Sequence, residues 1–325
     1  MSYIDLHCDT LLGAIERRAD VFTDLQDTSV NLNRLHEQGV KAQFMAMFLP
    51  DAEYAQKFAD AIPEDDDKLI KKMVSVLKKT VEDNPDKCAL VTDHDSMIAA
   101  NNEGKVGLFL TIEDGRSVHG KLDKIKKYYD MGVRLISLTW NFENCFGFPN
   151  SFEAGVMSRG LKPFGKQAVE YMNDLGVIID VSHLSDGGFW DVAKLSQKPF
   201  VASHSNARAM SAHPRNLDDD QIKALAKAGG VMGLNFCPPF LGDILGCTES
   251  RVSDMVRHIM YIYNLGGEDI LALGTDFDGI GGQLEIAVPA QMDLLWNALK
   301  QAGLTEHQIE KMQWQNALRV IKETL

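Results

Sequence analysis

Short apolar, β-branched runs alternate with longer amphipathic segments along the whole chain. Most of the runs are almost continuously apolar, which is typical of parallel strands buried on both faces and not of strands with one solvated face. We predict eight such strands. They cover residues 3–6, 42–48, 106–112, 133–139, 177–181, 200–203, 231–236 and 270–275.

Segments with helical spacing of apolar residues separate these runs. The clearest are residues 65–84, 121–131, 162–175, 218–228 and 253–265. Glycines that favour helix ends follow several of them, as at Gly176, Gly229 and Gly266. A strand followed by a helix, eight times over, predicts an α/β fold of the closed (β/α)₈ or TIM-barrel type. An open doubly wound sheet is the alternative, and the first strand lacks the GxGxxG sequence that would favour it.

The length and net charge of the chain limit the possible domain organisation and the classes of partner. The 325 residues contain no linker or break in composition, so we expect one domain over residues 1–325. The net charge of −13 disfavours nucleic acid as a partner, because an acidic surface repels phosphates. The acidic run at residues 64–67 is expected to be a solvated surface loop.

The cellular location is predicted from what the sequence lacks. Five cysteines without a CxxC pair indicate a reducing compartment. The first residues have neither the basic nor the apolar segment of a signal peptide. No apolar run approaches the roughly 20 residues needed to span a bilayer. We therefore predict a cytoplasmic protein that does not interact with a membrane.

Histidines and carboxylates stand where predicted strands end, and the active site of a (β/α)₈ barrel lies at those carboxyl ends. Side chains alternate along a strand, so the two polar residues of the first strand end point the same way. Buried together without a partner these groups would be costly, and a metal centre removes that cost. Imidazole and carboxylate ligands suit zinc, manganese or cobalt. The residues are His7, Asp9, Glu113, His183, His204 and Asp276.

Longer motifs around these residues identify a family. The chain resembles the membrane (renal) dipeptidases, peptidase family M19, a branch of the amidohydrolase superfamily, and it is similar to a cytoplasmic bacterial member. The likeness covers nearly the whole chain. The motifs are IDLHCD at residues 4–9, IEDG at 112–115, GVRLISLT at 132–139, LKPFG at 161–165, LGVIIDVSH at 175–183, SHS at 203–205, PRNL at 214–217 and GTDFDG at 274–279.

The resemblance implies a zinc-dependent dipeptidase with two Zn²⁺ ions per chain, which Mn²⁺ or Co²⁺ could replace. One metal would be held by His7 and Asp9, and Glu113 would bridge both metals. His183 and His204 would hold the second metal. Family members often accept L-Xaa-D-Xaa dipeptides and are often dimers, so a dipeptide substrate and a homodimer are expected.

The mechanism implied by the resemblance agrees with the chemistry of the residues. Two metals lower the pKa of a shared water, and the resulting hydroxide attacks the peptide carbonyl. Asp276 would take the proton of that water and pass it to the leaving amine, acting first as base and then as acid. Arg215 matches an arginine that contacts substrate, and its planar fork suits the dipeptide's carboxylate.

The sequence departs from the animal enzymes at two substrate positions. Trp140 stands where those enzymes have a histidine that helps to hold the substrate, and Phe240 stands where they have a tyrosine. Stabilisation of the oxyanion could then fall to the metal, to Trp140 or to the amide of Asn141 or Asn144. Neither departure touches a metal ligand, so we expect an active enzyme with altered substrate preference.

Two alternative functions and the role of one further residue stay open. Another metallohydrolase on the same scaffold, such as a lactonase, a phosphotriesterase-like enzyme or a deaminase, would use the same ligand types. A non-catalytic binding protein would lack ligands or the acid/base residue, and all six positions are present. Asp5 shares the strand parity of His7 and Asp9, which fits either support of a ligand or a simple capping or salt-bridge role.

Overall fold

The computed structural model describes residues 2–325 and has a closed parallel barrel at its centre. The eight strands that form the wall of the barrel, called staves below, follow one another around it in chain order. The pairing of β2 with β4 and that of β1 with β10 close the ring. Each stave lies in or overlaps one of the eight predicted runs, so the (β/α)₈ prediction is confirmed and the open sheet is excluded. The staves are β1 (Ile4–Cys8), β2 (Ala42–Phe48), β4 (Val106–Glu113), β5 (Val133–Ser137), β6 (Ile178–Asp180), β7 (Val201–Ala202), β8 (Val231–Leu234) and β10 (Leu271–Leu273).

One strand of the main sheet was not predicted. The three-residue β3 (Cys88–Leu90) pairs with the first residues of β4, while β5 pairs with β4 further along. A run of three residues is too short to display a period, which is why the sequence pattern missed it. A second small sheet joins β9 (Glu249–Ser250) and β11 (Gln283–Leu284).

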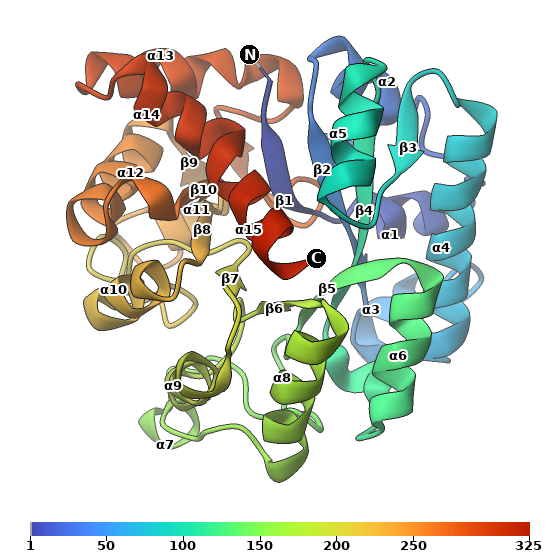
Figure 1. Ribbon diagram of the computed structural model, residues 1–325, viewed down its shortest axis with the longest axis horizontal. Helices are drawn as coiled ribbons and strands as arrows, with labels where there is room; N and C mark the ends of the chain where they lie inside the picture. The colour runs from blue at the N-terminus through green and yellow to red at the C-terminus, as the bar shows by residue number, and fades with distance from the viewer. Residues whose placement is uncertain (1) are drawn as a thin grey trace.

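Helices surround the barrel (Figure 1). The five predicted helices are present as α4, α6, α8, α10 and α12, each within two residues of its expected ends. The helices are α1 (Thr10–Glu16), α2 (Leu32–Glu37), α3 (Ala52–Lys57), α4 (Asp66–Asp83), α5 (His94–Asn102), α6 (Leu122–Met131), α7 (Ala154–Met157), α8 (Pro163–Leu175), α9 (Asp186–Leu195), α10 (Asp219–Lys227), α11 (Pro238–Leu241), α12 (Val252–Gly266), α13 (Asp293–Gln301), α14 (Glu306–Glu310) and α15 (Asn316–Thr324). Four shorter turns are η1 (Gly115–Val118), η2 (Glu268–Ile270), η3 (Pro289–Gln291) and the π-helical η4 (Lys311–Gln315).

The acidic run at residues 64–67 is a solvated loop only in its first half: Glu64 and Asp65 are exposed and precede α4, whereas Asp66 and Asp67 begin that helix, which corrects the prediction for them. Asp65 caps α4, and its side chain accepts a hydrogen bond from the Lys68 amide. Asp66 pairs with Arg116, and Asp67 pairs with Lys124. Carboxylates are favourable at a helix N-terminus because the helix dipole is positive there, so the run begins a helix.

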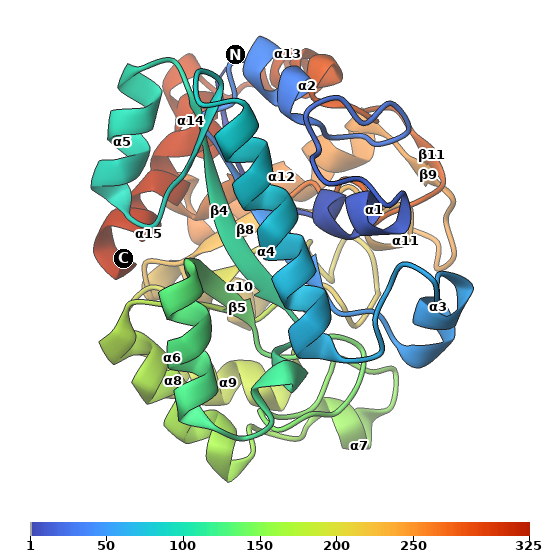
Figure 2. The same cartoon turned by 90° about the vertical axis from the view of Figure 1, so that its right-hand side faces the viewer.

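The barrel interior is closed at one end by the last helix. Apolar side chains from all eight staves form one inner cluster, and Ala317, Val320 and Ile321 of α15 belong to it. Figure 1 shows α15 lying across the barrel axis, and Figure 2 shows it at the end opposite to α1, α3 and α11. With that end sealed, the polar chemistry is confined to the other end, where the staves finish.

Among residues 2–325, no helix is both long enough and apolar enough to cross a membrane. The five cysteines are free.

Candidate metal centre

Six side chains meet at the carboxyl ends of the staves. His7 and Glu113 belong to the last residues of β1 and β4, and the other four lie one to three residues beyond the end of a stave. Each of the six is at most 9% exposed. The structure therefore brings together every histidine and carboxylate that the strand ends suggested: His7, Asp9, Glu113, His183, His204 and Asp276.

Glu113 stands between two groups of potential ligands. One carboxylate oxygen, Oε2, lies 3.3 Å from His7 Nε2. The other, Oε1, lies 3.1 Å from His183 Nε2 and 3.6 Å from His204 Nε2. His7 Nε2 is also 3.4 Å from Asp9 Oδ2. A carboxylate with one oxygen toward each group has the arrangement needed to bridge two ions.

Three overlapping sets of side chains have donor atoms close enough to share an ion. Within each set the donor atoms lie within 4.8 Å of one another. The sets share His7, Glu113 and His204 among them, so two ions could be held side by side. The sets are His7 with Asp9 and Glu113, Glu113 with His183 and His204, and His7 with His204 and Asp276.

The chemistry of the cluster fits divalent cations. Neither nitrogen of His7 has a hydrogen-bond partner among residues 2–325, and Asp9 Oδ1 has none either. Burial lowers the pKa of His7, but Glu113 and Asp9 outweigh it and raise that pKa well above its usual value. Burial and the nearby Glu113 raise the pKa of Asp9 to about 8. The protein alone thus leaves this cluster short of positive charge, which metal ions would supply.

The two histidines on the other side of Glu113, His183 and His204, favour their neutral form. Burial and the charge of Arg215 lower the pKa of His183 to about 4. Burial and His7 hold the pKa of His204 well below its usual range. A neutral imidazole keeps the lone pair that a metal requires, so these two side chains are already in the binding form.

The end of β1 departs from regular alternation. Ile4 and Leu6 point into the barrel, whereas Cys8 belongs to the outer core. The pairing of β1 with β2 shifts register between Asp5 and Cys8, and such irregularities re-aim side chains next to active sites. The shift accompanies the turn of His7 toward Glu113.

Asp5 supports the backbone of this end and contacts no ligand side chain. Its carboxylate accepts hydrogen bonds from the amide and hydroxyl of Thr275 at 2.9 and 2.7 Å, and from Gln43 Nε2 at 3.0 Å. The His7 amide donates to it at 3.4 Å. Of the two roles left open, capping is closer to these bonds, because Asp5 accepts from the backbone amides of Thr275 and His7.

Two of the six residues have a left-handed backbone. His183 has φ of 68° and Asp276 has φ of 63°. Such conformations cost non-glycine residues about 1–3 kcal/mol and concentrate at functional sites. Each is the third residue after a stave, in the loop that follows it, so the turn aims its side chain back across the barrel mouth.

Asp276 is fixed by two neighbours that the sequence did not single out. Asn235, just beyond β8, donates from Nδ2 to Asp276 Oδ2 at 2.8 Å. A Cβ at Gly279 would stand 2.0 Å from Asp9 Oδ2 and 2.6 Å from Asp276 Oδ1, so glycine is required there. Burial raises the pKa of Asp276, which favours a carboxyl group that both takes and gives a proton.

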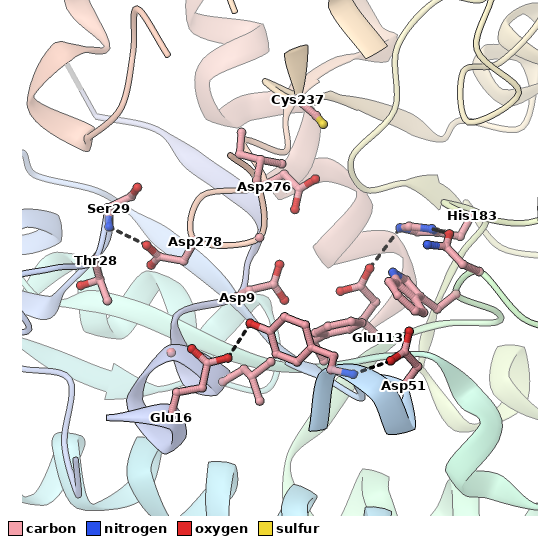
Figure 3. A pocket seen from close by; sticks show the side chains of 18 of the residues that line it. Asp9, Glu16, Thr28, Ser29, Asp51, Glu113, His183, Cys237, Asp276 and Asp278 are labelled. Atoms are coloured by element: carbon pink, nitrogen blue, oxygen red, sulfur yellow. Dashed lines mark hydrogen bonds and ion pairs between the residues drawn. The ribbon is translucent and has the colours of Figure 1, made fainter. Parts of the chain in front are cut away.

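A cavity of about 520 Å³ opens above the cluster. Figure 3 shows Asp9, Glu113, His183 and Asp276 around it, with Glu16 and Asp51 toward its edge. Phe48, Trp140 and Phe240 add apolar lining. Its size and mixed lining are typical of a site for a small molecule.

The predicted substrate residues fall into three groups. Trp140 and Phe240 line the cavity. Arg215 is 3% exposed and donates to Ser205 Oγ and the His204 carbonyl, both at 2.9 Å. Within residues 2–325, its Nε has no hydrogen-bond partner. It lies behind Phe240, with its guanidinium carbon 5.6 Å from the ring centre.

Asn144 does not line the cavity. Its amide donates to Asp114 Oδ1 and the Leu138 carbonyl, each at 2.8 Å, and its oxygen accepts from the Phe146 amide. Its polar atoms hold the loop, so the structure does not bring Asn144 to the cavity with Trp140 and Phe240. The neighbouring Asn141 lines the cavity instead and contacts His183 Nδ1 at 3.0 Å.

The chain is similar to a known family and to curated proteins. The family model for "Membrane dipeptidase (Peptidase family M19)" matches residues 1–325. An uncharacterized protein in the pqqA 5′ region of Klebsiella pneumoniae is 34% identical over 269 residues, which is 81% of this chain and 98% of the relative. An uncharacterized dipeptidase of Schizosaccharomyces pombe is 34% identical over 233 residues, which is 71% of this chain and 56% of that protein.

Solved structures resemble the whole chain. A metallo peptidase from Rhodobacter sphaeroides, liganded with a phosphinate mimic of the dipeptide L-Ala-D-Ala, has a TM-score of 0.91 and 26% identity. The match covers 100% of this chain and 99% of that one. A metallo peptidase of family M19 described as dipeptidase AC has a TM-score of 0.90, 26% identity and the same coverage.

Proposed function

The chain belongs to the membrane dipeptidase family, peptidase family M19, and is a metallodipeptidase; on that premise we propose that it cleaves dipeptides of the L-Xaa-D-Xaa type with two zinc ions. His7 and Asp9 would hold one ion, His183 and His204 the other, and Glu113 would bridge them. The observation that carries the proposal is the position of Glu113, whose two carboxylate oxygens face separate groups of ligands.

Zinc ions bound here would lower the pKa of a water shared between them and polarise the peptide carbonyl of the substrate. The protein supplies the dry surroundings, because all six side chains are buried. Manganese or cobalt would satisfy the same nitrogen and oxygen donors.

Asp276 is the proposed acid/base residue. Its carboxylate lies at the ligand cluster, with Oδ1 3.8 Å from His7 Nε2, and Asn235 holds its other oxygen. In the first step it accepts a proton from the attacking water. In the second it donates that proton to the amine nitrogen as the C–N bond breaks. The pKa of this carboxyl is raised by burial, which makes the proton easier to hold between the two steps.

Arg215 is proposed to bind the C-terminal carboxylate of the dipeptide. Within residues 2–325 it has no carboxylate partner, although it is buried and charged. Its guanidinium is buried near the charges of Asp276, Asp180 and Glu113 but makes no direct ion pair among the described residues, which a substrate carboxylate would supply. Trp140 and Phe240 would pack against the substrate side chains. The phosphinate-bound metallo peptidase from Rhodobacter sphaeroides supports a preference for a D-residue at the second position.

The first experiment measures amino-acid release by zinc-loaded protein from dipeptides in matched L,L and L,D pairs. We expect release, with the L,D member of each pair cleaved faster. Asp276→Asn should lower kcat by at least about 10²-fold, since general acid–base catalysis contributes 10²–10⁴-fold. Asparagine tolerates the left-handed backbone at this position, so the variant should fold normally.

The absence of release from every dipeptide, with metal bound, would overturn the proposed substrate class. An Asp276→Asn variant that keeps full activity would overturn the assigned role of this carboxylate. A cytoplasmic location and a homodimer stay predictions that rest on the sequence and on the family likeness.

A further inference from the structure

The two pairs of metal ligands differ in what stands behind their histidines. His183 Nδ1 lies 3.0 Å from Asn141 Oδ1, and His204 Nδ1 lies 2.7 Å from Ser203 Oγ. In contrast, His7 Nδ1 has no hydrogen-bond partner within residues 2–325. The protein therefore fixes two of the three imidazoles through their outer nitrogen and leaves the third without such a hold.

The partners of His183 and His204 also fix which nitrogen carries the proton. Asn141 Oδ1 can only accept, so His183 is protonated on Nδ1. Ser203 donates its hydroxyl proton to Asp180 Oδ2 at 2.6 Å and hence accepts from His204 Nδ1. In both rings Nε2 keeps its lone pair, and both Nε2 atoms face Glu113 Oε1.

Asp180 anchors this chain of hydrogen bonds. The carboxylate is fully buried and also accepts from the Ser137 hydroxyl and from the amides of Ser182 and Ser203. These donors come from β5, from the segment after β6 and from the segment after β7, so three adjacent parts of the barrel hold it. The hydrogen bonds that run from Asp180 through Ser203 Oγ therefore hold the imidazole ring of His204 in one orientation.

Beyond the contacts of its Nε2 with Glu113 and Asp9, the His7 side chain is held by ring stacking alone. Its ring stacks on that of His204 with a centroid separation of 3.8 Å. Stacking limits the tilt of the ring but does not choose the nitrogen that carries the proton. The position beside His7 offers one imidazole and several carboxylates, whereas the position beside His183 and His204 offers two imidazole nitrogens, which suit zinc.

We propose that zinc fills this centre in a fixed order, first between His183 and His204 and only then beside His7 and Asp9. Asn141 and Ser203, the latter through Asp180, are positioning residues that give the first position its higher affinity. The proposal rests on the proposed function only in taking these side chains as metal ligands. An enzyme short of zinc would hold one ion, at the His183–His204 position.

The direct test uses metal-free wild-type protein given one equivalent of zinc. Crystals of that sample, measured by anomalous scattering at the zinc edge, should place the ion at His183 and His204. Titration against a chelator of known affinity should resolve a tight and a weak step. Zinc found mainly beside His7 and Asp9, or divided equally, would overturn the proposal without any variant.

Variants test the cause of the order. Ser203→Ala should raise the Kd of the tight step about 10- to 100-fold, the usual effect of removing a hydrogen-bond partner from a metal-binding histidine, and leave the weak step within about 3-fold. Ser137→Ala is the matched control, because it removes a hydroxyl from the same Asp180 oxygen without touching the ring. It should change the tight step by less than about 3-fold.

Asn141 gives an independent comparison. Asn141→Leu should weaken the tight step as Ser203→Ala does, whereas Asn141→Asp, which keeps an acceptor oxygen, should retain it. Equal zinc affinities in wild type, Ser203→Ala and Asn141→Leu would reject these residues as the cause. Dipeptide cleavage by fully loaded enzyme tests the proposed function separately from the order of zinc binding. Full activity with zinc bound first beside His7 would reject only the order. Ordered zinc binding without any cleavage would reject only the proposed substrate class.

Discussion

At the scale of single residues, one added methyl group in the loop after β10 should disturb the metal centre directly. Gly279 lies against Asp9 and Asp276, and a Cβ there would overlap both carboxylates. We expect Gly279→Ala to displace a metal ligand and the acid/base residue together, lowering zinc affinity and kcat by 10-fold or more, the range seen when ligand support is lost.

Gly281→Ala is the control for that substitution, because a Cβ at Gly281 would meet nothing within 4 Å. Steady-state kinetics and zinc titration of the two variants provide the measurement. Equal behaviour of the two alanines would contradict the close approach described for Gly279.

Single residues also mark the limits of sequence reasoning. The six strand-end residues could be named because a strand end has a defined place on the barrel rim. Asn144 and Asn141 could not be told apart, since the course of the loop after β5 decides which amide faces His183. Asn235, Ser203 and Asp180 carried no signal of their own, because their role lies in the side chains that folding places beside them.

At the scale of elements, one ion-pair cluster joins α4 to α6. Asp67, in the first turn of α4, accepts hydrogen bonds from Lys124 Nζ and from the Tyr128 hydroxyl, both at 2.8 Å. Burial raises the pKa of Asp67, but these two partners outweigh it and lower that pKa to about 2. The folded protein therefore favours the charged carboxylate.

The lowered pKa makes the contribution of this contact depend on pH. It is fully present above the ordinary pKa of 3.8 and is lost as pH falls through about 2. We expect Asp67→Asn to destabilise the protein by about 1 kcal/mol at pH 6 and by less at pH 3. Thermal unfolding at both pH values measures this.

Asp130→Asn is the matched control, because it breaks an exposed pair with Lys126 on the same helix, α6. Such pairs contribute only about 0.3–0.5 kcal/mol. If Asp67→Asn lowered stability equally at pH 3 and pH 6, the charge of the Asp67 carboxylate would not be what makes this contact stabilising.

At the scale of the whole molecule, the metal centre ties together staves from around the barrel. Its proposed ligands lie at or just beyond the ends of β1, β4, β6 and β7, and they converge only in the folded chain. Zinc should thus bind the folded state far better than the unfolded one. At free zinc 100 times the Kd, the gain in unfolding free energy is about 2.7 kcal/mol.

We accordingly expect removal of metal by a chelator to lower Tm by several degrees, with recovery when zinc is restored. Glu113→Gln, which weakens the bridging carboxylate, should reduce the response to zinc. Differential scanning calorimetry of metal-free and zinc-loaded protein measures both. If the wild-type protein had the same Tm with and without zinc, bound metal would not be joining the staves of the barrel.

The sequence by itself determined the barrel, because continuous apolar runs separated by amphipathic segments fit few other architectures. It also determined the residue types at the barrel mouth, since each stands at the end of a strand. Only the tertiary structure decided the β1 irregularity that accompanies His7, the acidic start of α4, and the exchange of Asn144 for Asn141 in the cavity. The physical reason is the separation along the chain of the residues that determine each feature. The apolar pattern of a strand depends on neighbouring residues, whereas the hydrogen bonds that orient a side chain join residues far apart in the chain, as Asp5 and Thr275 are.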